Sequence, residues 1–445
     1  MKKKLLRSIE KLQLPKFLFF ISLFTITILY GFFAFPLEWF PFQLINNAVI
    51  FINEKTTLPY GVYETEYTST IPIYDKDKAY KSLSLVTAIA ANDLISAKII
   101  NMEGEVVHEW LIDWFDLWPY PTHIPEDYPY LPKERPGTVI DGAVLLENGD
   151  LIFNFSNLGM MKLDICGNID WRLPYFTHHS IYLDEDGILW AAGNIYHEER
   201  MEEYPQFQPP VYETTIIKVS LEGEIIEEIS VLDLLKKNDL IGLYFLSDKN
   251  DYAEISDDPL HLNDVKPFPS SMEEGIFHHG DIVISIRNRN TIIVFQEEEL
   301  KVTQVITGGF VRQHDPDFLD GNTLSVFDNN SIAEPDYEQQ SSIRIINLIE
   351  GTNTIYYTGN AENYFYSEIR GRHQWLPNGN LLVTDTNSGR AFEVDQNGNI
   401  VWEYVNFVGD GFAGYISEVS RLPVNFTEKF FNLLNSNCEA NTIDG

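Results

Sequence analysis

The sequence is poor in cysteine and in positive charge. Its 445 residues include only two cysteines, Cys166 and Cys438, so neither a cysteine framework nor a thiolate metal cluster supports the fold. The two cysteines either form one disulfide, which an exported location would permit, or stay two separate buried thiols. Asp and Glu number 66 against 31 Lys and Arg, a formal charge of −35. Because so acidic a body repels phosphate backbones, we expect no nucleic-acid partner.

The few basic residues are concentrated at the N-terminus. Residues 1–16 carry six Lys or Arg against one Glu, and residues 17–35 that follow are without charge. As a helix, this uncharged stretch would be about 28 Å long, close to the hydrocarbon thickness of a bilayer. The basic flank predicts a cytoplasmic N-terminus and a body on the periplasmic or extracellular side. Since no small-residue cleavage site follows, we expect an uncleaved membrane anchor rather than a signal peptide.

Helical periodicity is scarce in the rest of the chain, and a repeated β phrase takes its place. An apolar run, a Gly-centred turn and an alternating strand recur, as in AVLLENGDLIFNF (143–155) and WLPNGNLLVTDT (375–386). Asn-Gly and Asp-Gly supply the positive φ angles of tight hairpins, and the alternation buries one face of each strand. Two hairpins per unit of about 40 residues or more are typical of propeller blades. The prediction is an all-β, six-bladed β-propeller behind an N-terminal transmembrane helix.

These patterns divide the chain into five segments. We expect a basic cytoplasmic segment, a transmembrane anchor, a juxtamembrane linker, the propeller and a C-terminal tail, at residues 1–16, 17–35, 36–84, 85–430 and 431–445 respectively. The aromatic insertion at residues 110–137 has two interpretations, a loop packed on a blade or a lid over a ligand.

Histidine is also rare, with ten in the chain, yet several stand in equivalent places. The pair His178 and His179, then His261, His314 and His373, each lie just before or at the start of the innermost strand of a repeat. In a propeller these strand starts converge on the central channel, so the sequence predicts a ring of imidazoles around one pocket. A single such histidine would more simply be a hydrogen-bonded residue at a strand end.

The motifs around these histidines resemble one family. HHSIYLDEDG, HLNDV followed by DIVISIRNRNTIIVF, RQHDPDFLDGNTLSVFDNN and HQWLPNGNLLVTDTNSGRAFEVDQNGNIVWEY occur in this order over residues 85–425. The set resembles the arylsulfotransferases that need no nucleotide sulfate donor. The resemblance implies an exported six-bladed propeller whose central histidine carries a sulfuryl group from a phenyl sulfate donor to a phenol acceptor. It implies no cofactor and no metal.

The resemblance also assigns roles to residues. His314 matches the transiently sulfated histidine, and His261, Asn263 and Arg287 would hold the sulfuryl oxygens together with the His178 and His179 pair, of which we prefer His179. We further expect His373 to take the proton of the acceptor. For Arg372 and Arg390 the expectation is exposed ion pairs with the abundant carboxylates.

The residues fit the expected chemistry. A neutral imidazole is a good nucleophile near neutral pH, and a covalent intermediate divides one difficult transfer into two easier ones. Two alternatives remain. Imidazoles with Asp315 or Asp385 could bind a divalent metal, as in propeller hydrolases, although Arg287 in the same ring disfavours a second cation. The propeller could instead be a membrane-tethered binding scaffold without catalysis.

Overall fold

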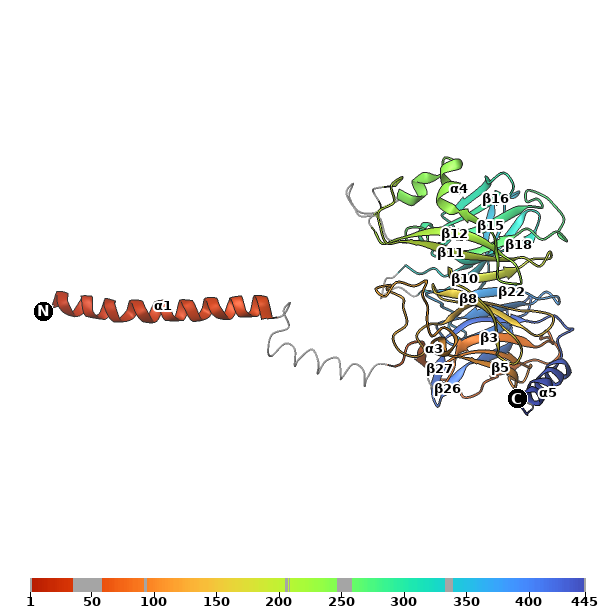
Figure 1. Ribbon diagram of the computed structural model, residues 1–445, viewed down its shortest axis with the longest axis horizontal. Coiled ribbons are helices and arrows are strands. Elements are labelled where there is room, and N and C mark those ends of the chain that lie inside the picture. The colour runs from red at the N-terminus through yellow and green to blue at the C-terminus, as the bar shows by residue number, and fades with distance from the viewer. Residues whose placement is uncertain are drawn as a thin grey trace. The chain divides into compact units, whose positions relative to one another are not determined.

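The structure is a computed structural model that describes residues 2–34, 58–91, 94–204, 207, 209–245, 258–332 and 339–443. The chain forms two compact units, Met1–Tyr60 and Gly61–Gly445, which we describe separately (Figure 1). The larger unit therefore takes in residues 61–84, which the sequence assigned to a linker. Most of the predicted juxtamembrane segment, residues 36–57, lies outside the described residues.

The smaller unit contains one long helix, α1 (Lys2–Ala34). Its window Lys16–Phe33 has a mean hydropathy of 1.9 and is not buried by any other part of the protein. By length and composition this helix fits a membrane anchor or a signal sequence. The predicted apolar helix is confirmed, while its anchoring role and orientation stay predictions.

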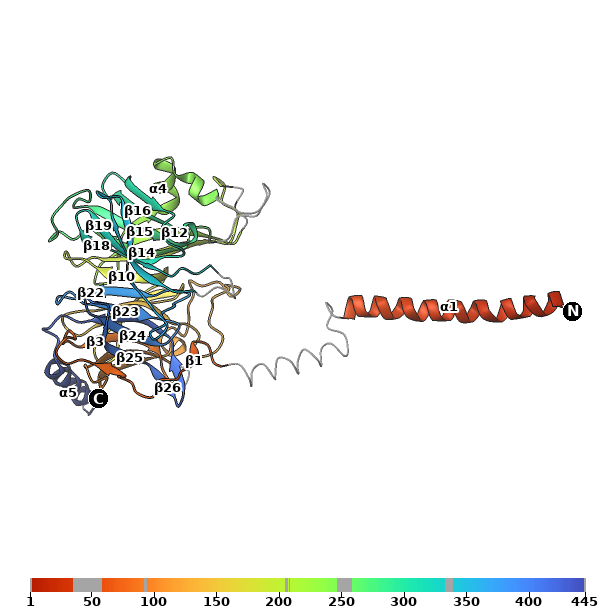
Figure 2. The same ribbon diagram turned by 180° about the vertical axis from the view of Figure 1, so that it is seen from behind.

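The larger unit is built of antiparallel sheets (Figures 1 and 2). In hydrogen-bonding order its main sheets are β28 (Ile416–Arg421), β3 (Ser84–Ile89), β4 (Ile95–Ile100) and β5 (Val106–Ile112); β6 (Ile140–Leu145), β7 (Leu151–Phe155), β8 (Gly159–Leu163) and β9 (Ile169–Leu173); β10 (Phe176–Leu183), β11 (Leu189–His197), β12 (Val211–Val219) and β13 (Ile225–Ser230); β14 (Leu262–Pro267), β15 (Asp281–Ile286), β16 (Thr291–Gln296) and β17 (Lys301–Thr307); β18 (His314–Asp320), β19 (Thr323–Asp328), β20 (Ser342–Asn347) and β21 (Thr352–Thr358); and β22 (Arg372–Trp375), β23 (Leu381–Asp385), β24 (Arg390–Val394), β25 (Ile400–Val405) and β2 (Ile73–Tyr74). A small sheet joins β1 (Val62–Glu64), β27 (Phe412–Gly414) and β26 (Phe407–Gly409).

The first strands of the main sheets form a closed ring. Contacts run from β6 to β10, β14, β18, β22 and β28, and from β28 back to β6. Late and early parts of the chain share a sheet at this closure, because β28 pairs with β3. The early strand β2 adds a fifth, outer strand to another sheet by pairing with β25. The predicted all-β propeller is confirmed. The number of six blades stays a prediction, to which the six sheets of four or five strands correspond.

Turn chemistry and core packing agree with the sequence pattern. Gly379 has a φ of 82° between β22 and β23, and a Cβ there would lie 2.4 Å from Nε2 of Gln396. Only glycine fits such a position without strain. The facing surfaces of neighbouring sheets are filled by buried aliphatic and aromatic side chains such as Phe153, Phe295 and Phe392.

In three regions the structure corrects an expectation from the sequence or decides between two alternatives that the sequence left open. Residues 431–445, predicted as a tail, belong largely to helix α5 (Glu428–Ile443). Cys438 on this helix forms a disulfide with Cys166, which excludes two separate thiols. The aromatic insertion packs as a covering loop, since Trp114 (in α3, Trp114–Leu117) and Tyr128 are buried against the core of the neighbouring sheets. Besides α1, α3 and α5, the described residues include one further α-helix, α4 (Val231–Lys237), and two short 3₁₀ helices, η1 (Ile241–Phe245) and η2 (Arg287–Arg289).

Candidate functional site

Bulges interrupt the inner strands at the channel. The pairing register shifts within β6, β10, β14, β18 and β28, at the pairs Ile140/Ala143, His178/Ile181, Leu262/Asp264, His314/Asp317 and Ile416/Glu418. A bulge adds a residue on one strand and turns its side chain in a new direction. Non-glycine residues with positive φ lie within two of these bulges, at His179 and Asp315, and just before β14 and β22, at His261 and Arg370. Each such conformation costs about 1–3 kcal/mol and is typical of functional sites.

Four of the predicted histidines come together there. We call His178, His179, His261 and His314 the imidazole cluster. The His179 ring lies 4.9 Å from the His261 ring and 5.9 Å from the His314 ring, between centroids. His178 lies 5.0 Å from His179. Residues 136 positions apart in the chain, His178 and His314, thus belong to one cluster, as the strand-start pattern predicts.

A small cavity lies beside the cluster. It holds about 10 Å³, room for roughly one water molecule, so the aromatic part of any substrate would lie outside it. Its lining includes three of the predicted site residues, His179, Asn263 and His314. The other lining residues are Asp141, Asp264, Asp315, Arg370, Gly371, Arg372 and Ser417.

The surroundings of His314 fix its tautomer. Its Nδ1 lies 2.7 Å from Oδ1 of Asn329 and 3.1 Å from the carbonyl oxygen of Arg312. The Asn329 amide is oriented by its own Nδ2, which donates to the carbonyls of Ser367 and Arg370. Because both partners of Nδ1 only accept, Nδ1 carries the hydrogen and Nε2 keeps its lone pair.

The electrostatics keep His314 neutral. Burial and then the Arg287 guanidinium hold the pKa of His314 well below its usual value, against the opposing bond to Asn329. The imidazole is therefore uncharged at neutral pH, the form that acts as a nucleophile.

The neighbouring imidazoles are neutral for related reasons. His178 and His179 share a 2.8 Å contact between their Nδ1 atoms, so one donates and the other accepts. Burial first, and then the neighbouring His261, lowers the pKa of His178 to about 4 and holds that of His179 well below its usual value. The backbone N–H of His179 donates to Asp141, which also pairs with Arg370.

His261 has a carboxylate partner instead. Both its backbone N–H and its Nδ1 bond to Asp258, one bond to each carboxylate oxygen. Burial raises the pKa of Asp258, but His261 outweighs it and leaves the pKa below its usual value. Arg287 is tied to the same segment, because its backbone N–H donates to the His261 carbonyl at 3.1 Å.

The remaining predicted residues serve other contacts. Asn263 lines the cavity and donates through Nδ2 to the carbonyl of Gln313, next to His314. The His373 side chain is fully buried, with Nε2 2.7 Å from Ser325 Oγ and Nδ1 3.0 Å from an Asp315 oxygen. It does not line the cavity.

A second group of charges lies on the inner strands β14, β18 and β22. We call Asp264, Lys266, Asp315, Asp317, Arg372 and His373 the ion-pair cluster. Lys266 lies 2.7 Å from Asp315 and 2.5 Å from Asp317, and Arg372 lies 3.1 Å from Asp264 and 3.2 Å from Asp315. The expectation of exposed ion pairs was wrong, because the Arg372 side chain is 15% and that of Arg390 5% exposed.

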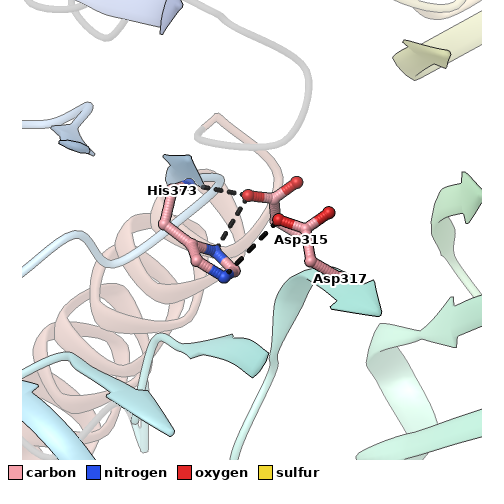
Figure 3. A group of neighbouring side chains, drawn as sticks. All are labelled: Asp315, Asp317 and His373. Carbon is pink, nitrogen blue, oxygen red and sulfur yellow. Dashed lines mark hydrogen bonds and ion pairs between the residues drawn. The ribbon is translucent and has the colours of Figure 1, made fainter. Parts of the chain in front are cut away.

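Part of this cluster has the composition of a metal site (Figure 3). Asp315, Asp317 and His373 offer three ligand atoms within 4.8 Å of one another. The Lys266 ammonium already contacts both carboxylates, and Asp385 pairs with Arg390 at 3.0 Å. A divalent ion would have to displace a buried lysine here, which disfavours the metal alternative.

Sequence reasoning missed several residues of the site. Asp141 and Arg370 occupy the strand starts of their repeats, the same places as the histidines, and a search not limited to histidine would have found them. Asp258 stands three residues before His261, a spacing that turns reach easily. Asn329 carried no signal, because it lies 15 residues from His314 and resembles an ordinary turn residue.

The fold and site define a β-propeller with three neutral imidazoles, those of His178, His179 and His314, in its central channel. The model of the arylsulfotransferase (ASST) family matches residues 142–407, more than half of the chain, and the chain belongs to this family. The family indicates a sulfotransferase enzyme.

Solved structures show weaker likeness. A protein of unknown function from Bacteroides caccae is 14% identical, with 76% of this chain and 98% of that chain covered and a TM-score of 0.46. Virginiamycin B lyase from Staphylococcus aureus is 11% identical, with coverages of 65% and 86% and a TM-score of 0.34. No curated protein matches the sequence.

Proposed function

We propose that the protein transfers a sulfuryl group from an aryl sulfate ester to a phenol, through a sulfohistidine intermediate on His314. The observation that carries this proposal is the state of His314. Its Nδ1–H is held by Asn329 and Arg312, its pKa is depressed, and it lines the cavity with His179. A locked, neutral imidazole with a free Nε2 lone pair is a prepared nucleophile.

In the first step, Nε2 of His314 attacks the sulfur of the donor. The N–S bond forms while the bond from sulfur to the aryl oxygen breaks, and its electron pair leaves on the phenolate. The His314 ring gains positive charge, which strengthens the hydrogen bonds from Nδ1–H to Asn329 and to the Arg312 carbonyl. A phenolate is a stable leaving group, so this step needs little acid assistance.

The sulfuryl oxygens need hydrogen-bond donors during transfer. Sulfuryl transfer resembles phosphoryl transfer in its loose transition state, so the protein chiefly positions the reactants and balances charge. Arg287 supplies a permanent charge, and His179 and His261 lie within the same cluster. Each donor well placed for the transition state contributes roughly 3–4 kcal/mol, by analogy with oxyanion holes.

In the second step, the acceptor oxygen attacks the sulfur and the N–S bond breaks, which returns the electron pair to Nε2. The phenolic proton needs a base. The sequence suggested His373, but its side chain is fully buried, does not line the cavity, and its Nε2 is bonded to Ser325. We therefore assign the proton to His261, whose Nδ1 is held by Asp258 and whose ring stands beside His179.

The location follows from α1. We propose that this helix anchors the enzyme and that the propeller acts on the periplasmic or extracellular side, where the basic N-terminal flank would leave it.

The proposal is tested with the full chain in detergent, a nitrophenyl sulfate, a phenol and no nucleotide. We expect nitrophenol release that depends on the phenol and is lost in His314→Ala. Release by His314→Ala at the parent rate would overturn the mechanism, whereas no release from the parent protein would favour a scaffold.

A further inference from the structure

Arg287 and Arg312, near the proposed nucleophile His314, lack the carboxylate partners that other cations in the channel have. The sequence has 66 Asp and Glu for 31 Lys and Arg, so partners are abundant. In the channel, Arg370 pairs with Asp141, and Arg372 pairs with Asp264 and Asp315. Among the residues that the structure describes, neither Arg287 nor Arg312 has a carboxylate within 4.0 Å.

The backbone joins these two arginines. Asn290 ends the short helix η2, and its N–H donates to the Arg287 carbonyl at 3.1 Å. Its side chain Oδ1 in turn accepts the backbone N–H of Arg312 at 2.8 Å. The two residues are therefore held beside each other although they lie 25 positions apart in the chain.

Their charges also act on each other. After burial, the Arg312 guanidinium is the main cause that lowers the pKa of Arg287, and Asp258 and Glu368 oppose it from beyond ion-pair distance. Asp258 is itself bonded to His261. Two like charges kept close without a counterion are costly, and they persist where a ligand supplies the counterion.

Arg312 is placed to reach a molecule that reacts at His314. Its carbonyl accepts from Nδ1 of His314 at 3.1 Å, its φ of 54° is a left-handed conformation, and the residue is exposed. The backbone is thus buried against the nucleophile, while the residue as a whole is open to solvent. An aryl group too large for the small cavity would extend toward such an exposed residue.

A charge count gives the substrate class. A sulfate monoester carries one negative charge, and Arg287 alone balances it. We propose that Arg312, next to Arg287, forms a subsite for a second anionic group, so that preferred donors are aryl sulfates with a carboxylate or a further sulfate on the ring. This inference rests on the proposed function and specifies its substrate.

The kinetic test compares 4-nitrophenyl sulfate with a nitrophenyl sulfate that carries a ring carboxylate. In the parent protein we expect kcat/KM to be about tenfold higher for the carboxylated donor, and in Arg312→Gln the two values should be nearly equal. Arg312→Lys keeps the charge and should retain part of the preference. Arg172→Gln, on the outer strand β9, is the matched control and should leave the preference intact.

A binding test separates this inference from the proposed reaction. In a sulfonate the sulfur is bonded to carbon, so benzenesulfonate and the 3- and 4-sulfobenzoates bind without transfer. We expect a sulfobenzoate to bind about tenfold more tightly than benzenesulfonate, and Arg312→Gln to abolish the difference. If this holds while no nitrophenol is released from any donor, the subsite stands and the proposed reaction fails. Equal affinities in the parent, or a preference that survives in Arg312→Gln, would overturn the subsite.

Discussion

The imidazole cluster and the ion-pair cluster meet on β18, yet they differ in charge and in partners. His314 belongs to the first and Asp315 to the second, although they are consecutive. His178, His179 and His314 are neutral, and His314 keeps one ring nitrogen free. The carboxylates of the second cluster are matched by Lys266 and Arg372. This contrast indicates that one cluster is prepared for chemistry and the other holds the strands in place.

The largest effect should come from removing the nucleophile. His314→Ala should lower kcat by at least about 10⁴-fold, since the covalent route is lost. His278→Ala is the control, because the side chain of that histidine is 58% exposed. It lies in the loop between β14 and β15, at the opposite end of β14 from His261. A decrease in kcat of less than tenfold in His314→Ala would mean that the neutral cluster is not the reacting one.

Removing a charge from the ion-pair cluster should lower the stability of the fold. Lys266→Met leaves buried Asp315 and partly exposed Asp317 without their shared partner, so the free energy of unfolding should fall by about 3–5 kcal/mol, measured by denaturant unfolding of the full chain. Lys76→Met removes an exposed pair with Glu103 and should have no resolvable effect. An unchanged stability in Lys266→Met would contradict the structural role of this cluster.

The two clusters should also differ in how they make folding stability depend on pH. The pKa of His178 is lowered from 6.5 to about 4, so the unfolded chain binds the proton first and folding stability decreases as the pH falls from about 6.5 to 4. The expected contribution is about 3 kcal/mol. Asp264, whose pKa burial raises to about 6, has the opposite slope here.

The measurement is therefore the difference between the parent and His178→Gln in thermal unfolding across this pH range. The parent should lose more stability than the variant as the pH falls. Parallel curves would show that His178 is not held neutral by burial. Below about pH 4, further loss of folding stability should come from protonation of carboxylates such as Asp315. Its pKa is held below its usual range mainly by Lys266, against the effect of burial.

The smallest effect concerns the support of the nucleophile. Asn329→Ala removes one acceptor of the His314 Nδ1–H but leaves the Arg312 carbonyl, so kcat should fall by about 10- to 150-fold with little change in KM. Asn347→Ala, in the same sheet, removes a hydrogen bond to Thr323 and is the control. A change in KM alone would instead place Asn329 in substrate binding.

The sequence predicted the propeller and the meeting of four histidines, because hairpin turns and strand starts are local signals that repeat along the chain. It did not predict the support of the site. The Asn329 and Asp258 contacts depend on loops folding back toward the channel. Arg372 was expected at the surface because charged side chains are seldom buried, although the neighbouring His373 already marked its strand as an inner one. Helix α5 was missed because Asn and Ser residues weaken its helical pattern.

The most direct test looks for the intermediate itself. The full chain is exposed to a nitrophenyl sulfate without acceptor, kept mildly alkaline to preserve an N–S bond, digested and analysed by mass spectrometry. We predict one added SO₃ on His314, which disappears when phenol is supplied. An SO₃ group on another residue, or a burst of nitrophenol with His314 unmodified, would contradict the account.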